Sequence, residues 1–235
     1  PRSTQGVSSA ASDVYKRQLK DELREVAEKY GNDRRSEITA AVGSFNVEDL
    51  IVEEDMVVTL SHQGYVKRLP VDTYRAQRRG GRGLRGMDTK EEDWVEGMFI
   101  ASTHDYLMIF TRRGQCYWKK VWEIPVGGRT ARGKPIINLL NLGEDEQIAA
   151  VLPVREFSDD KYLLFGTRLG VVKKTALSAY GNVRTVGLNA INIREEDELI
   201  DVQVTSGEDE VILASRAGKA IRFHESDARP MGRAT

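Results

Sequence analysis

The chain has 235 residues, of which 40% are apolar, so it is long enough and hydrophobic enough to fold around an ordinary core. Its 35 lysines and arginines nearly balance 36 aspartates and glutamates, and a formal net charge of −1 favours no class of partner. The single cysteine, Cys116, excludes an internal disulfide, and no apolar run approaches the ~18 residues of a membrane span. No secretory leader is visible, so the sequence predicts a cytoplasmic protein.

The N-terminal forty residues predict a leader, one helix and a linker. Residues 1–18 lack hydrophobic periodicity, and we expect them to be disordered or foreign to the protein. Residues 19–40 predict a helix and a linker, with an apolar seam at Leu19, Leu23, Val26 and Tyr30. One such stripe needs a partner helix, and no other helical pattern follows. We therefore expect that partner upstream and interpret the chain as part of a longer one.

Residues 41–235 predict a repeated β structure. A strand, a glycine turn and a second strand recur around glycines 64, 114, 170 and 218, which are spaced by 50, 56 and 48 residues. A period near 50 with about four strands in each unit is typical of a propeller-like array of blades. Three units are complete and a fourth begins, so the predicted fold is mainly β, preceded by one α-helix. Cys116 lies in one of these runs, where a buried strand position is expected.

The charges separate within each unit. Basic residues dominate 62–86, 112–134 and 168–184, whereas acidic residues dominate 88–105 and 195–210. If the units stack around an axis, the basic segments would align into a belt that suits a polyanion. Ordinary mixed charge on the surface of β-hairpins is the alternative.

Motifs that resemble catalytic or metal sites lack the required context. Gly81–Gly86 satisfies GxGxxG, but it follows no apolar strand and opens no helical pattern, as a dinucleotide site requires. Gly128–Lys134 satisfies GxxxxGK, but Pro135 replaces the Ser or Thr that would hold Mg²⁺. The histidines occur singly, without the local pairing of zinc sites. We expect no catalytic residue, no metal site and no cofactor in this chain.

The segment Gln77–Gly83, with sequence QRRGGRG, is the most informative one. Arginine forks match phosphate oxygens in bidentate geometry. Glycines allow a backbone to approach a bulky polyanion closely. The composition therefore favours a loop that lies against a sugar-phosphate backbone.

Gln77–Gly83 resembles, without departure, the seven-residue box of the DNA gyrase A-subunit family. Residues 28–38 are similar to the end of the long helix in that family's breakage-reunion domain, and residues 227–234 to the junction of its third and fourth blades. The resemblance covers residues 19–235. The paralogous protein of topoisomerase IV has a degraded box, so the intact box favours gyrase.

The resemblance implies a β-pinwheel, a disc of six blades, of which about three and a half would be present. It implies that the disc wraps double-stranded DNA, while the box helps to close the disc. The whole enzyme would be a bacterial, chromosome-associated A2B2 complex that introduces negative supercoils with ATP and Mg²⁺, both bound mainly through the B subunit. The catalytic tyrosine and the A-subunit dimer contacts would lie upstream, so this chain would bind DNA without cutting it.

The predicted DNA contacts fall into two groups. The box group is Gln77, Arg78, Arg79, Gly80, Gly81, Arg82, Gly83 and Arg85. The rim group is Lys67, Arg68, Lys119, Lys120, Arg129, Arg132, Lys173 and Lys174. Three alternatives remain at this point: the corresponding domain of topoisomerase IV, a binder of single-stranded RNA, and a propeller that serves as a protein scaffold.

Overall fold

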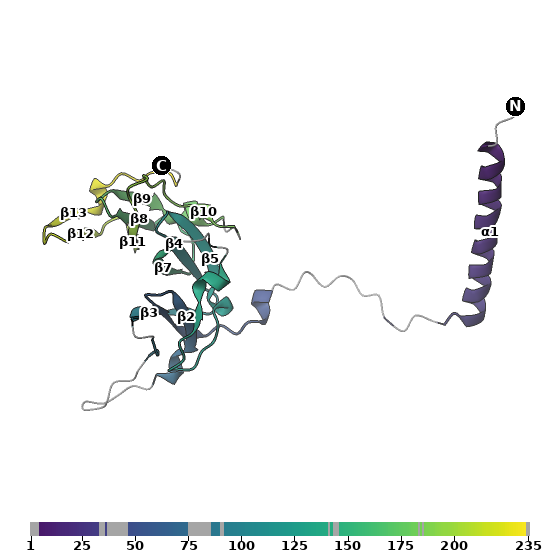
Figure 1. Cartoon of the computed structure of the whole chain (residues 1–235), viewed down its shortest axis with the longest axis horizontal. Helices are drawn as coiled ribbons and strands as arrows, with labels where there is room; N and C mark the ends of the chain where they lie inside the picture. The colour runs from purple at the N-terminus through teal and green to yellow at the C-terminus, as the bar shows by residue number, and fades with distance from the viewer. Residues whose placement is uncertain are drawn as a thin grey trace. The chain divides into compact units, whose positions relative to one another are not determined.

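The structure is a computed structural model that describes residues 5–32, 36, 47–74, 86–89, 92–140, 142, 146–182, 184 and 186–233. The chain divides into two units, Pro1–Phe45 and Asn46–Thr235. Among the described residues, the first unit holds one α-helix and the second holds the strands (Figure 1). The prediction of a mainly β chain preceded by one helix is therefore confirmed.

Helix α1 spans Gln5–Tyr30, so it begins earlier than the sequence indicated. Residues 5–18, which we expected to be disordered or foreign to the protein, are therefore helical in the structure, whereas a foreign origin stays a prediction. The helix side chains from residue 13 to residue 30 are exposed, including Leu19, Leu23 and Val26. Residues 5–18 have no apolar period, so the sequence contains no such helix signal there. Residues 7–30 contain no proline or glycine to interrupt the helix. It ends at Tyr30, and the Gly31 amide donates to the Ala27 carbonyl at 2.8 Å.

Four antiparallel hairpins form the framework of the second unit. The glycines that turn them, at positions 64, 114, 170 and 218, have φ of +80°, +83°, +82° and +76°, a region that glycine enters without strain. The predicted repeat is thus confirmed. The paired strands are β1 (Asp55–Ser61) with β2 (Tyr65–Pro70), β4 (Tyr106–Thr111) with β5 (Gln115–Lys120), β8 (Tyr162–Thr167) with β9 (Val172–Ala176), and β12 (Glu210–Ala214) with β13 (Ala220–His224).

Each hairpin is followed by a short 3₁₀ turn, and two further 3₁₀ turns occur elsewhere in the described residues. The turns after the hairpins are η2 (Val71–Thr73), η3 (Val121–Glu123), η5 (Leu177–Tyr180) and η6 (Glu225–Asp227), and the others are η1 (Val47–Leu50) and η4 (Ile136–Leu139). Val121 and Leu177 begin their turns as buried core residues. Glu225 begins the last turn and is also buried, which makes it the polar exception.

The remaining strands join neighbouring units. β3 (Val95–Ser102), β7 (Ile148–Val154) and β11 (Leu199–Thr205) each precede the next hairpin and pair with the first strand of the previous one. Two short strands cross further back: β6 (Lys134–Pro135) pairs with β2, and β10 (Leu188–Asn189) pairs with β5. The sheet orders are β3-β1-β2-β6, β10-β5-β4-β7, β11-β8-β9 and β12-β13. The first and second units are therefore each closed by a strand from the unit that follows.

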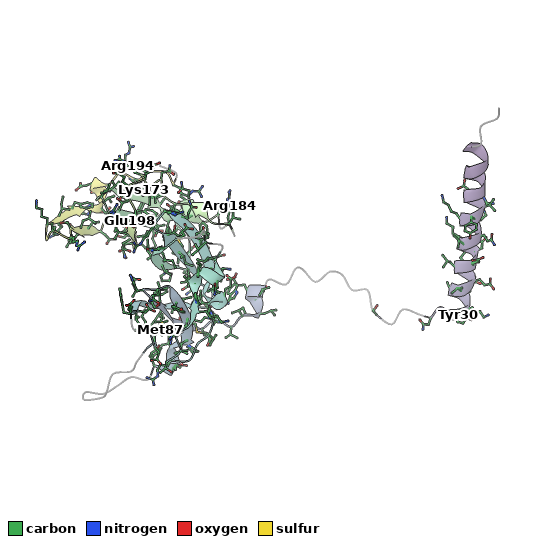
Figure 2. All side chains as sticks on the ribbon, in the orientation of Figure 1. Tyr30, Met87, Lys173, Arg184, Arg194 and Glu198 are labelled. Atoms are coloured by element: carbon green, nitrogen blue, oxygen red, sulfur yellow. The ribbon has the colours of Figure 1, made fainter. Side chains whose placement is uncertain are left out.

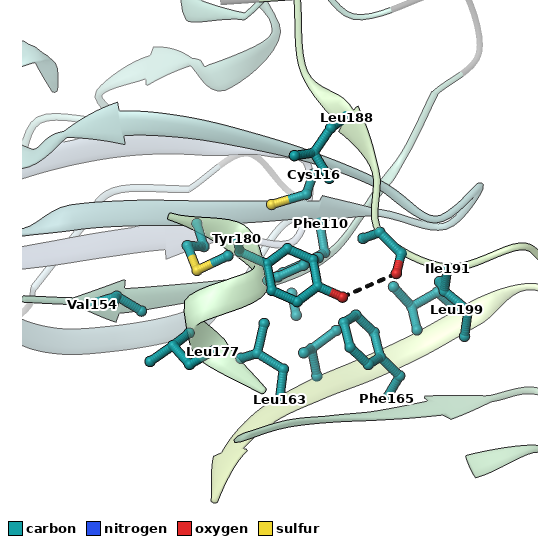
Figure 3. Packing of buried hydrophobic residues seen from close by; sticks show 14 of the residues in the cluster. Phe110, Cys116, Val154, Leu163, Phe165, Leu177, Tyr180, Leu188, Ile191 and Leu199 are labelled. Atoms are coloured by element: carbon teal, nitrogen blue, oxygen red, sulfur yellow. Dashed lines mark hydrogen bonds between the residues drawn. The ribbon is translucent and has the colours of Figure 1, made fainter. Parts of the chain in front are cut away.

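Strand β4 lies between two hydrophobic cores, because alternate side chains of a strand point to opposite faces. Leu107 and Ile109 belong to a core shared with the first hairpin. Met108 and Phe110 belong to a core shared with the third hairpin, which Figure 3 shows around Tyr180. The Tyr180 hydroxyl, buried in this core, donates to the Ala190 carbonyl at 3.0 Å (Figure 3).

Candidate nucleic-acid interface

The box and Arg85 lie outside the described residues, but the repeat places a counterpart of the box in the structure. Gly83 follows the turn glycine Gly64 by 19 residues, and Gly133 follows Gly114 by the same interval. The counterpart of Gln77–Gly83 is therefore Gly127–Gly133, which we call the second-unit loop. Arg129 and Arg132 occupy the positions of Arg79 and Arg82.

Gly133 shows why a glycine stands at the end of this loop. Its φ is +85°, and a Cβ there would lie 2.4 Å from the carbonyl oxygen of Val66 in the preceding unit. Gly187, in the third unit, has φ of +74°, and its Cβ would lie 2.6 Å from the Tyr117 ring. In both units, a glycine lets the backbone come against the hairpin before it.

The second-unit loop is attached to strand β2 by backbone and side-chain hydrogen bonds. The Arg68 amide donates to the Pro125 carbonyl at 3.0 Å, and the Gly127 amide donates back to the Arg68 carbonyl at 3.1 Å. Within the loop, the Ala131 amide donates to the Gly128 carbonyl at 3.0 Å. Arg132 is exposed, with its guanidinium carbon 5.8 Å from the centre of the Tyr65 ring, and Arg129 is half-buried. Both side chains belong to a loop whose backbone is held in place.

Three predicted rim lysines do not lie on an exposed rim. The Lys67, Lys173 and Lys174 side chains are buried, with 0%, 2% and 4% of their surface exposed. The ammonium of Lys67 donates to two loop carbonyls, and that of Lys173 donates to the Ala190 and Arg233 carbonyls. Lys174 forms an ion pair with Glu225 at 3.1 Å. Buried cations with protein partners do not fit the expected role of phosphate contacts.

The side chains of Arg68, Lys119 and Lys120 also have protein partners. Arg68 Nε donates to the Ile124 carbonyl at 2.7 Å, and its Nη2 to the Trp122 carbonyl at 3.1 Å. Lys119 pairs with Glu123 at 3.0 Å. Lys120 pairs with Glu48 at 2.7 Å and lies 3.8 Å from the centre of the Tyr106 ring. These contacts tie strands to the turns beside them, so Arg129 and Arg132 are the strongest rim candidates within the described residues.

Surface arginines that the sequence did not single out lie around two hairpin turns. Arg112 and Arg168 both pair with Glu198, at 3.3 and 3.4 Å. Arg184 and Arg194 are also at the surface, whereas Lys173 is buried; all three are labelled in Figure 2. Position in the repeat could have indicated Arg184, because it lies three residues before Gly187 in the third-unit counterpart of the second-unit loop.

The histidines and the cysteine have structural surroundings. His62 stacks on Trp94 with ring centres 3.9 Å apart, and His104 Nε2 lies 3.0 Å from the Ile51 carbonyl. Burial raises the pKa of the Cys116 thiol well above its ordinary value, as for an inert core residue. In the described part of the chain, no three His, Cys, Asp or Glu side chains are grouped to hold a metal, and no helix is long and apolar enough to cross a membrane.

Burial gives Lys173 a pH-dependent effect on stability. Desolvation, aided by the nearby charge of Arg233, lowers its pKa from 10.5 to about 8. Between these pH values the unfolded chain holds a proton that the folded protein has released, so the free energy of unfolding rises with pH. We expect Lys173 to raise the free energy of unfolding by roughly 3 kcal/mol between pH 8 and pH 10.5.

Urea unfolding of the wild type and of Lys173→Met at pH 7 and pH 10 measures this rise. The two variants share every other titrating group, so the difference between them isolates Lys173. Parallel pH profiles would contradict the expectation.

Comparison with known proteins agrees with this architecture. Residues 55–102, 105–155, 161–206 and 209–235 match the family described as DNA gyrase C-terminal domain, beta-propeller. Each of these segments contains one hairpin. The DNA gyrase A protein of Aeromonas salmonicida is 53% identical over 213 residues, which are 91% of this chain and 23% of that protein. The chain thus spans about a quarter of the length of the curated relatives it matches.

Two solved structures have similar folds. The C-terminal domain of DNA topoisomerase IV superposes with a TM-score of 0.66 at 32% identity, covering 78% of this chain and 56% of that one. The DNA gyrase A C-terminal domain superposes with a TM-score of 0.61 at 28% identity, covering 77% and 58%. Since the family match runs from the first hairpin to residue 235, the chain belongs to the DNA gyrase C-terminal domain family of β-propellers.

Proposed function

We propose that this chain is the part of a DNA gyrase A protein that binds and wraps double-stranded DNA. The observation that carries the proposal is the repetition of an arginine-bearing segment that ends in glycine at one position of successive units, Gln77–Gly83 and Gly127–Gly133. Arg79 and Arg82 of the box have counterparts in Arg129 and Arg132. These two arginines lie at or near the protein surface, on the second-unit loop that Lys67 holds by a hydrogen bond. Repeated cationic loops suit a ligand with regularly spaced phosphates.

The energetics of wrapping favour this arrangement. Bending 20–30 bp of DNA smoothly by 40–90° costs on the order of 1–6 kcal/mol, so a wrapped duplex needs phosphate contacts along its whole curved path. Contacts to phosphate carry no base information, which suits a protein that acts on DNA of any sequence. A stack of units that each offer an arginine loop supplies such contacts.

Other parts of the proposal rest on family membership. We propose that the complete protein forms a homodimer, works with the gyrase B protein in the bacterial cytoplasm and introduces negative supercoils. ATP and Mg²⁺ would act mainly through the B protein, and this chain would need no cofactor. The chain alone would not cleave DNA, so supercoiled plasmid incubated with it should keep its linking number.

Replacing Arg78, Arg79 and Arg82 together by alanine tests the role of the box. We expect weaker binding to a ~40-bp duplex and a slope of log K against log salt that is smaller by about 2.7, or about 0.9 for each lost phosphate contact. Fluorescence anisotropy between 50 and 200 mM salt measures both quantities.

The matched control is the triple alanine variant at Arg17, Lys20 and Lys29, which removes the same charge from exposed positions of α1. It should leave the slope nearly unchanged. Equal effects of the two triple variants would mean that the box acts only through net charge.

Preference for single-stranded RNA would favour the RNA binder, and no salt-dependent binding would favour the scaffold. The topoisomerase IV alternative is not favoured, because relatives near 50% identity are gyrase A proteins.

A further inference from the structure

Lys67 is a fully buried lysine whose ammonium bonds to the following unit. It donates to the carbonyls of Gly128 at 2.9 Å and Arg129 at 2.6 Å. Its stem packs on both ends of the second-unit loop: a Cβ on Gly127 would lie 3.2 Å from Lys67 Cδ, and one on Gly133 would lie 3.1 Å from Lys67 Cβ. The loop therefore closes around this one side chain.

The same arrangement recurs two units later. Lys173 follows its turn glycine by three residues, as Lys67 does, and its ammonium donates to the Arg233 carbonyl. The donor and acceptor residues are 62 positions apart for Lys67 with Arg129 and 60 for Lys173 with Arg233. The unit between has Tyr117 at this position, and its ring lies against Gly187. Burying a lysine is costly, so two buried lysines at the same position of different units indicate that both have the same structural role.

We propose that Lys67 is a positioning residue for DNA binding, which latches the second-unit loop so that Arg129 and Arg132 meet the phosphates. The proposal rests on the function proposed above. Two carbonyl oxygens bound to the ammonium point into the protein, so their partial negative charge is withdrawn from the DNA-facing side of the loop. The same bonds fix the backbone that carries the two arginines, so less conformational entropy is lost when DNA binds.

A double-mutant cycle on the 235-residue chain tests this latch. Its variants are Lys67→Met, the pair Arg129→Ala with Arg132→Ala, and their combination, each titrated with a ~40-bp duplex. We expect Lys67→Met to weaken binding about 3- to 10-fold, which lies in the lower part of the range of coupling between contacting residues. In the background without the two arginines, Lys67→Met should change affinity by less than about twofold. Amide hydrogen exchange at Ala131 should also become faster in Lys67→Met.

Lys173→Met is the matched control, since it removes a buried lysine from the equivalent position of another unit. It should leave the contribution of Arg129 and Arg132 intact. If Lys67→Met does not fold, Lys67→Gln, whose uncharged amide group can still donate to the carbonyls, takes its place in the cycle. If the affinity losses from Lys67→Met and from the two arginine substitutions multiply in the combined variant, Lys67 does not act through the arginines. If the effect of Lys173→Met on affinity depends on Arg129 and Arg132 as strongly as that of Lys67→Met does, the effect is not specific to Lys67. Either result would contradict the positioning role of Lys67 while leaving DNA binding in place. Absence of duplex binding by the wild type would instead refute the proposed function.

Discussion

Lys174→Met is expected to lower the free energy of unfolding by about 3–5 kcal/mol, the cost of leaving a buried charge without its partner. The ion pair of Lys174 and Glu225 is almost completely shielded from water, with 5% and 0% of the side chains exposed. The remaining carboxylate would keep hydrogen bonds from the Thr205 hydroxyl and from the Gly207 and Asp209 amides. These neutral donors do not replace a cation. Urea unfolding followed by circular dichroism measures the loss.

The double variant Lys174→Met with Glu225→Leu is the control for this prediction. Glu225 begins its 3₁₀ turn at the position where Val121 and Leu177 are buried in the preceding units. An apolar pair should therefore fit, and we expect the double variant to recover most of the lost stability. If the single and double variants are equally unstable, the ion pair is not the reason for the loss.

The same pair makes the last unit sensitive to acid. Burial alone would raise the pKa of Glu225, but hydrogen bonds from Thr205 and Lys174 outweigh it, and the pKa lies below its ordinary value of 4.5. A carboxyl with a lowered pKa contributes stability that is fully present above pH 4.5 and is lost as the pH falls through the folded-state value. The wild type should therefore lose stability relative to the double variant as the pH falls below 4.5, which urea unfolding of both proteins at neutral and acid pH measures.

Gly114→Ala is expected to destabilise the protein by about 2–5 kcal/mol, the sum of backbone strain and a clash in a packed region. Gly114 has φ of +83°, and a Cβ there would lie 2.4 Å from the Ile191 carbonyl oxygen. Its own carbonyl accepts hydrogen bonds from the Ala190 amide at 2.8 Å and the Ile191 amide at 3.3 Å. The substitution therefore pushes apart two units that meet at this turn.

Gly170→Ala provides the matched control. Gly170 turns the next hairpin with nearly the same φ, +82°, but a Cβ there meets no atom within 4 Å. It should cost only about 1–2 kcal/mol from the strained backbone. Thermal unfolding of both variants measures the difference, and equal losses would show that the contact with Ile191 is unimportant.

Much of the local structure could be predicted from the sequence because it depends on neighbouring residues. The turn glycines need φ above zero, so their spacing revealed four hairpins. The continuous apolar run of strand β4 reflects burial on both of its faces. The start of α1 could not be predicted in this way, since residues 5–18 have no apolar period to reveal a helix.

The partners of the cations, in contrast, required the tertiary structure. Lys67, Lys173 and Lys174 lie in basic segments and look like surface residues in the sequence, yet each is buried against residues of the following unit. The repeat, the hairpins and the positions of the arginines within each unit could be predicted from the sequence, because turn glycines and strand patterns depend on local backbone preferences. Which cations face water depended on tertiary contacts, because their partners lie about 50 to 60 residues further along the chain and meet them only when strands of one unit pair with the next.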